Sequence, residues 1–489
     1  MNNFQHFFSS RFCRRGLLLA VTFLIMLHTY WGEKIPLKAG AGWDGVQYRE
    51  LVLHFDRMYL NGEVDAYHMH RILPFALSHG VLRCTGLPFT AENAMLVTVV
   101  VNQVVLLLTM LVFFRISSLR RWSVATELIG FAAAFWNVAV LKVFGYYPFL
   151  TDELALLLSF LAAYHYFSRQ YGWLLVDGLL AMITWPALSL VVWLLLVFPQ
   201  KASAEQASDF SVGRWLRWAG VICFPPIFLA FIYYKVRVHE GISFADMFTL
   251  RPPLNIWWTL LAVAVVPVFY WFALKPLQSL RLSLSGKSLL RICVGALIFI
   301  LLYQLTAYGS MNTGFTPAKE LAQMAQLPAS DVLIFLETPF IYWGPFALLL
   351  IWNWPTICRK TLKEESTGLV LVLFFFLFFL LDIETRKHVM FFPFLLVLLM
   401  DVVKQQSWSS KGMWLFVGTS LLMAAWWYPW NVEGMFEALN SNQVAQYLQF
   451  PAQRYFMFQG LAQSREVYAV ALIVEMLVLF AGWKIYKRS

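Results

Sequence analysis

The sequence predicts an all-α, polytopic integral membrane protein with about 13–14 transmembrane helices. Three observations predict it: a very apolar composition, long apolar runs that recur along the chain, and basic residues gathered between those runs. Of the 489 residues, 60% are hydrophobic and 13% are charged, and the mean hydropathy is +0.64. Because soluble domains contain about 25% charged residues, this composition excludes a soluble enzyme, a disordered protein, a disulfide scaffold and a coiled coil.

Apolar runs long enough to cross a bilayer recur along the whole chain, since a spanning helix needs about 20 mostly apolar residues. The runs that we expect to be helical are 17–30, 92–114, 123–143, 150–168, 171–199, 215–234, 254–274, 292–309, 333–354, 367–381, 389–403, 413–430 and 467–485. The fifth of these is too long for one simple span, and Thr184-Trp185-Pro186 lies in its middle. Because proline removes a backbone donor and breaks a helix, we expect two shorter helices there.

The basic residues predict an orientation in the membrane, because Lys and Arg accumulate in cytoplasmic loops. With a cytoplasmic N-terminus, most of the 37 Lys and Arg residues fall in cytoplasmic segments, and most of the 27 Asp and Glu residues fall in extracytoplasmic ones. The C-terminus is then cytoplasmic as well. The net charge of +10 therefore reflects membrane topology, and we expect no nucleic-acid partner.

The chain divides into two predicted transmembrane modules, with no soluble domain expected. Residues 1–200 form the N-terminal module, which contains a long extracytoplasmic loop over 31–91, and residues 201–489 form the C-terminal module. Arginines precede the first apolar run, as in a secretory signal. Bulky residues at 28–31 provide no small-x-small cleavage site, so we expect a retained first helix.

A first cluster of ionisable residues lies in the extracytoplasmic loop. Glycines on both sides of Trp43-Asp44 predict a turn that presents the carboxylate just before a helix. Asp44 and Tyr48 are one helical turn apart and would share a face. The alternative is that Asp44 only caps a surface helix. His70 and Arg71 follow later in the same loop.

Two further clusters lie at predicted extracytoplasmic helix ends. Asp152 and Glu153 open a strongly apolar helix, where adjacent carboxylates are costly unless they face a wet cavity. Favourable charges at a helix N-terminus are the alternative. The segment 382–388 contains Arg386 and His388 between two very apolar runs. A guanidinium suits forked contacts with phosphate, although the segment could also be an ordinary charged connector.

The sequence gives no firm sign of a metal or a nucleotide. No CxxC, HExxH or P-loop motif occurs. The four histidines within 54–79 lack metal-ligand spacing. Hard divalent cations such as Mg²⁺ or Mn²⁺ take oxygen ligands, so the candidate ligands for one are Asp44 with Asp152 or Glu153.

Three motifs resemble those of the GT-C superfamily, polytopic glycosyltransferases that use polyprenyl-phosphate-linked sugars. Trp43-Asp44-Gly45-x-x-Tyr48, followed by Tyr67-x-x-x-Arg71-Ile72-Leu73-Pro74, resembles their first lumenal loop. Thr151-Asp152-Glu153 is similar to their second acidic motif, and Arg386 to Pro393 is similar to a late Arg/His-to-Pro segment. The resemblance covers residues 1–200 as architecture. Many members have Arg-Pro in the fifth-helix region, where this chain has Trp185-Pro186.

The resemblance implies inverting transfer of a sugar on the extracytoplasmic face, with a lipid phosphate as the leaving group. Asp44 would be the general base that takes the proton of the acceptor hydroxyl. The donor phosphate would be bound by the basic residues Arg71, Arg386, His388 and His70.

The other residues in these motifs would hold the second substrate. Asp152 and Glu153 would orient the acceptor or bind a cation. Trp43, Gln47 and Tyr48 would line the substrate. The expected partners are the lipid bilayer, a polyprenyl-phosphate-linked sugar, and a glycan, lipid or protein acceptor.

Two other classes of function fit parts of the pattern. A carrier or flippase for a lipid-linked or small anionic solute would also have many helices, prolines and charges near the membrane. Its charges would be expected near the bilayer midplane, whereas here they gather at helix ends on one side. An O-acyltransferase that uses a loop histidine is the third interpretation, and no clear motif supports it.

Overall fold

The computed structural model describes residues 10–35, 38–42, 44–200, 212–233, 256–279, 286–306, 332–364, 366–382, 384–427, 469–470 and 472–477. Over these residues the fold is all-helical and contains no strand, which confirms the predicted class. The helices are α2 (Arg11–Tyr30), α3 (Gly45–Leu60), α4 (Ala66–Met69), α5 (Leu73–Thr85), α6 (Ala91–Leu119), α7 (Val124–Phe135), the π-helix η1 (Ala139–Val143), α8 (Phe144–Tyr146), α9 (Asp152–Phe167), α10 (Tyr171–Met182), α11 (Pro186–Val197), α12 (Val212–Tyr233), α13 (Ile256–Ala273), the 3-10 helix η4 (Lys275–Leu277), α14 (Gly286–Thr306), α16 (Ile334–Trp343), α17 (Pro345–Glu364), α18 (Thr367–Phe379), the 3-10 helix η5 (Thr385–Met390), α19 (Phe392–Val403) and α20 (Ser410–Met423).

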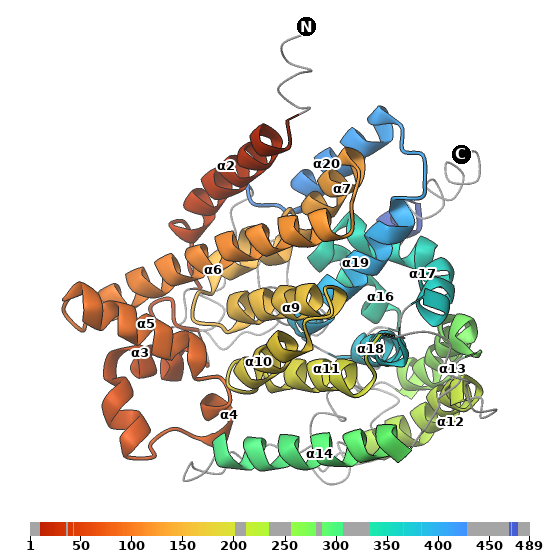
Figure 1. Ribbon diagram of the computed structural model, residues 1–489, viewed down its shortest axis with the longest axis horizontal. Coiled ribbons are helices and arrows are strands. Elements are labelled where there is room, and N and C mark those ends of the chain that lie inside the picture. The colour runs from red at the N-terminus through yellow and green to blue at the C-terminus, as the bar shows by residue number, and fades with distance from the viewer. Residues whose placement is uncertain are drawn as a thin grey trace, which may run out of the picture.

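The central helices α9 and α19 lie between α3 and α5 at one end of the molecule and α12 and α13 at the other (Figure 1). Helix α14 runs along one edge beside α10 and α11. Aromatic rings fill part of the core where α6 packs near α7 and α9. The Phe131 and Phe135 ring centroids are 4.9 Å apart, and Phe113 lies edge-on to both.

By length and composition, two helices in the described part of the chain could cross a membrane, namely α2 and α6. A third span exists if α7 and the segment Ala139–Tyr146, which are bent by 47° relative to each other, count as one. Six other apolar helices have 10–17 residues. The predicted total of 13–14 crossings and the sidedness therefore stay predictions.

The apolar run 171–199 is split into α10 and α11, as Thr184-Trp185-Pro186 predicts. The two helices form a hairpin, because the Gln200 backbone N at its far end donates to Tyr171 Oη at 3.1 Å. Each helix has 12 residues and is about 18 Å long, less than the hydrocarbon core of about 30 Å. The two ends of a hairpin that does not cross the membrane lie on the same side of it, as do the two ends of a pair of full crossings. The predicted sidedness of the remaining segments is therefore unchanged.

The run 333–354, which we expected to be one helix, is two helices. Helix α16 ends before Gly344, whose φ of +63° lies in the left-handed region. Pro345 then begins α17. A proline disfavours helical backbone in the residue before it, and glycine tolerates the resulting turn. The expectation of a single span was wrong at this point.

Segments that share a predicted cytoplasmic location contact one another through ion pairs. Arg14 and Arg15 on α2 bind Glu127 on α7, at 3.0 and 2.6 Å. Arg120, which follows α6, pairs with Asp401 near the end of α19. These contacts join α2 to α7 and the end of α6 to α19, pairs of helices that are far apart in the sequence.

Candidate functional site

The turn before α3 presents Asp44 through close packing against one tyrosine ring. Gly42 has a φ of +72°, and a Cβ at this position would lie 2.3 Å from Tyr147 Cζ. The backbone N of Gly45 donates to Tyr147 Oη at 3.1 Å. Asp44 occupies the N-cap position, but its side chain makes no capping hydrogen bond. The capping alternative therefore does not describe this carboxylate.

The Gly42→Ala variant is expected to destabilise the protein. A left-handed backbone costs a residue with a Cβ about 1–2 kcal/mol, and the contact with Tyr147 adds to that cost. Thermal unfolding of the purified protein, followed by tryptophan fluorescence, measures the effect. Gly80→Ala is the matched control, because Gly80 lies within α5 with nothing within 4 Å of its Cβ position. Equal melting temperatures for the two variants would contradict the packing role of Gly42.

Tyr67 connects Asp44 to Arg71. The Tyr67 hydroxyl donates to Asp44 Oδ2 at 2.9 Å. The guanidinium of Arg71, four residues after Tyr67, lies 3.8 Å from the centroid of the Tyr67 ring, and its Nη1 donates to the Tyr67 carbonyl at 3.2 Å. Asp44 Oδ1 accepts no hydrogen bond from the described residues, and Arg71 pairs with no carboxylate among them. A carboxylate oxygen and a guanidinium thus lie on either side of one aromatic ring.

Arg386 is held by two carboxylates in the interior. It lies on η5, and its Nη1 is 3.0 Å from Asp152 Oδ2 at the start of α9. Its Nη2 is 3.1 Å from Glu384 Oε2. Arg386 is 4% exposed and Asp152 is 1% exposed, so this pair is shielded from water. The second oxygen of Asp152 is buried and has no partner among the described residues.

Trp185, at the tip of the α10–α11 hairpin, brings the two guanidinium groups together. The Cζ atoms of Arg71 and Arg386 lie 5.7 and 5.4 Å from the centroid of its ring, within the range of cation–π attraction. We call Asp44, Tyr67, Arg71, Trp185 and Arg386 the Asp44 cluster. All except Trp185 come from segments that the charge pattern predicts to be extracytoplasmic.

The two acidic residues that open α9 point to different neighbours. Asp152 binds Arg386, whereas Glu153 Oε1 accepts from Asn102 Nδ2 on α6 at 3.1 Å. Within the described ranges, no group of three or more His, Cys, Asp or Glu side chains could hold a metal ion. Of the carboxylates named for a divalent cation, Asp152 binds a guanidinium and Asp44 binds a phenol, and a cation at this place stays a prediction.

The residues predicted to line the substrate differ in their surroundings. Tyr48 is buried, with its ring stacked on Phe75 at 4.1 Å and edge-on to His68 at 4.9 Å. Gln47 is half-buried on the first turn of α3. Trp43 lies outside the described residues. Tyr48 is therefore a packed, buried residue next to the Asp44 cluster.

The two histidines predicted to bind phosphate lie apart from the Asp44 cluster. His70 is stacked on Tyr303 at 3.8 Å, and its Nδ1 is 3.0 Å from Thr306 Oγ1 on α14. His388 Nε2 donates to the Phe379 carbonyl at 3.0 Å. Burial lowers the pKa of both imidazoles to about 4, and the charge of Arg71 adds to the effect at His70. Both are neutral at pH 7 and supply no positive charge there.

Four residues have contacts that the sequence did not lead us to expect: Tyr67, Glu384, Asn102 and Trp185. The spacing of four residues between Tyr67 and Arg71 is the one local signal, because it places both on one helical face. The sequence marks Trp185 only by its position before Pro186 and predicts no contact for its side chain. The partners of Glu384 and Asn102 are set by tertiary packing.

Comparison of the chain with protein-family models, with curated proteins and with solved structures gives no match.

Proposed function

We propose that this protein is a membrane glycosyltransferase that moves a sugar from a polyprenyl-phosphate donor to an acceptor on the extracytoplasmic face. One observation carries the proposal: the Asp44 carboxylate does not cap its helix and lies in one cluster with two guanidinium groups. A base and cations are the groups that this reaction needs, since a hydroxyl loses a proton while a phosphate gains negative charge.

In the proposed reaction Asp44 is the general base. The acceptor oxygen forms a bond to the anomeric carbon, and the bond from that carbon to the phosphate oxygen breaks. The bonding electron pair leaves with the phosphate, and the hydroxyl proton goes to Asp44 Oδ1. The hydrogen bond from Tyr67 to Oδ2 orients the carboxylate so that Oδ1 faces the acceptor.

Arg71 is the main phosphate-binding residue in this proposal. Arg386 already pairs with Asp152 and Glu384, which neutralise it. Arg71 forms no ion pair with the described residues; its close contacts are the Tyr67 carbonyl and the rings of Tyr67 and Trp185, and the charge of Glu384 acts on it from farther away. We therefore assign Arg386 a positioning role, in which it fixes the Trp185 ring that Arg71 also contacts.

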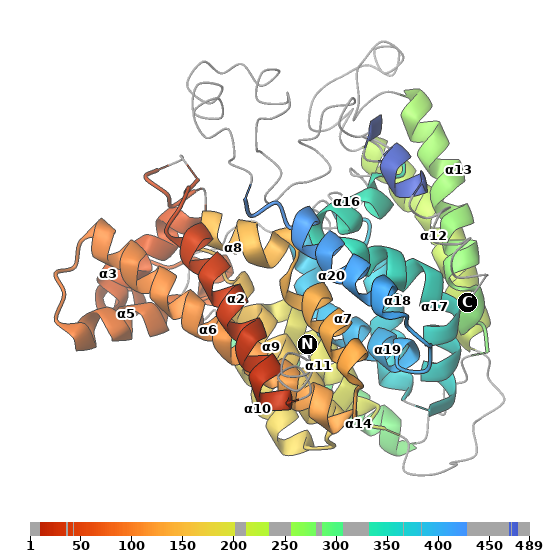
Figure 2. The ribbon, with the colours of Figure 1, turned by 90° about the horizontal axis from the view of Figure 1, so that it is seen from above.

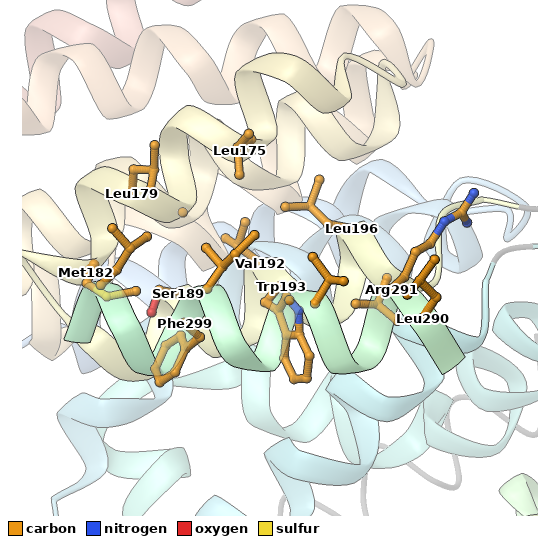
Figure 3. A pocket seen from close by; sticks show the side chains of 16 residues that line it. Leu175, Leu179, Met182, Ser189, Val192, Trp193, Leu196, Leu290, Arg291 and Phe299 are labelled. Atoms are coloured by element: carbon orange, nitrogen blue, oxygen red, sulfur yellow. The ribbon is translucent and has the colours of Figure 1, made fainter. Parts of the chain in front are cut away.

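An apolar groove next to the Asp44 cluster supports a lipid donor. It has a volume of about 380 Å³ and runs between the α10–α11 hairpin and α14 (Figure 3). Met182 and Phe299 lie at one end and Arg291 at the other. Met182 is three residues from Trp185, so a polyprenyl chain in the groove would have its phosphate near Arg71.

Transfer in liposomes tests the proposed function. The full-length protein is reconstituted with a polyprenyl-phosphate-linked sugar and a mixture of glycan, lipid and peptide acceptors. We expect a glycosylated product that appears only with protein present. Uptake of an anionic solute or movement of the lipid between leaflets, without any transfer, would overturn the enzyme proposal in favour of a carrier.

The Arg71→Lys variant is expected to transfer sugar about tenfold more slowly than the parent. Lysine keeps the charge but loses the planar stacking on Tyr67 and the forked contact with phosphate. Initial rates against donor concentration measure the change. Arg57→Lys is the control, because Arg57 forms an exposed pair with Glu63 on the far part of the same loop. Equal rates for Arg71→Lys and the parent would contradict the phosphate role.

A further inference from the structure

A second pocket, of about 230 Å³, lies where the C-terminal ends of α2 and α20 meet η1 and α8. Figure 2 shows α2 beside α8, with α20 nearby. The residues that matter for its chemistry are His28, Glu33, Lys142, Tyr146, Trp426 and Trp427. None of these residues belongs to the Asp44 cluster.

An ion pair forms the polar part of this pocket. Lys142 Nζ lies 3.3 Å from Glu33 Oε2, and Lys142 is 7% exposed. Lys142 is on the π-helical segment η1, which lies between α7 and α8. Such segments are frequent at functional sites, and burying a charged side chain is costly unless it is paired.

Two indole rings form the aromatic part. Trp426 is half-buried, with its ring edge-on to His28 at 6.0 Å, and Trp427 is 52% exposed. Ala425 before them has a φ of +50°, which is strained for a residue with a Cβ. The strained turn places both indoles at the pocket.

This combination suits a neutral sugar unit. A sugar hydroxyl both donates and accepts, so adjacent hydroxyls can accept from Lys142 and donate to Glu33 at once. The pair has no net charge, and Glu33 would repel a phosphate. An acyl chain could make no hydrogen bond to the ion pair. The C–H face of a sugar ring fits the electron-rich face of an indole.

The pocket is connected to the Asp44 cluster through adjacent residues. Tyr146 lines the pocket, and Tyr147 holds Gly45, the residue after Asp44. The charge pattern places the pocket and Asp44 on the same predicted side of the membrane. We propose that this pocket binds a non-reacting sugar unit of the acceptor, so that the acceptor is a saccharide or a glycolipid. This inference rests on the proposed function and names its acceptor class.

Binding without any donor tests the inference separately from transfer. The full-length protein in lipid nanodiscs is titrated with the methyl glycosides of glucose, galactose, mannose and N-acetylglucosamine, and contacts are measured by saturation-transfer NMR. We expect at least one glycoside to bind. Trp427→Ala should weaken that binding about tenfold, the amount for a lost aromatic contact. Trp414→Ala is the matched control, because Trp414 on α20 is also 52% exposed but does not line the pocket.

Two outcomes would overturn the inference: no glycoside binds the parent, or Trp427→Ala binds as tightly as the parent. With a saccharide acceptor, Trp427→Ala should also raise KM about tenfold and leave kcat unchanged. A parent that transfers sugar but binds no glycoside retains the proposed function and loses this site. A parent that binds glycosides and transfers no sugar retains the site and loses the proposed function.

Discussion

The Asp44→Asn variant is expected to transfer sugar about 10²–10⁴-fold more slowly than the parent, the usual contribution of a general base. Asparagine is close to the same size and can still accept the hydrogen bond from Tyr67, but its amide cannot take a proton from the acceptor. The loss should appear mainly in kcat. Because the Asp44 side chain does not cap α3, the fold should be retained.

The measurement compares initial transfer rates with thermal unfolding for the same preparations. Asp56→Asn is the matched control, because Asp56 is on the same helix α3 and its side chain is 64% exposed. We expect it to have parental activity and stability. If Asp44→Asn transfers sugar at the parental rate, Asp44 is not the base.

Local sequence patterns predicted the parts of the Asp44 cluster that depend on neighbouring residues. Glycines around Asp44 predicted the turn before α3, which Gly42 and Gly45 make by packing against Tyr147. Pro186 predicted the break that puts Trp185 at the tip of a hairpin. Turns and helix breaks follow from backbone conformation, so a few adjacent residues are sufficient to predict them.

Contacts across the fold could not be predicted in this way. The ion pair between Asp152 and Arg386 joins residues 234 positions apart. The charge pattern placed both at predicted extracytoplasmic helix ends, but it does not specify the direction in which a side chain points. For the same reason it did not distinguish His70, which faces α14, from its neighbour Arg71, which faces Trp185.

The Arg386→Met variant is expected to lose about 3–5 kcal/mol of stability, because removing one partner leaves buried charges uncompensated. Asp152 is 1% exposed and has no other ion pair among the described residues, whereas the charges of Lys387 and Arg71 also act on Glu384. Methionine fills a similar length but cannot pair with either carboxylate. Thermal unfolding in nanodiscs, followed by tryptophan fluorescence, should show a large decrease in melting temperature.

Two further variants separate this effect from a general loss of an arginine. Arg83→Met removes an exposed pair with Asp56, whose side chains are 69% and 64% exposed, and such pairs contribute about 0–1 kcal/mol. The double variant Arg386→Met with Asp152→Asn should melt above Arg386→Met alone, because the uncompensated buried charge of Asp152 is gone. If Arg386→Met melts like Arg83→Met, or the double variant regains nothing, the carboxylates do not depend on Arg386. Arg386 would then be available to bind phosphate directly, and Arg71 would not be the main phosphate-binding residue.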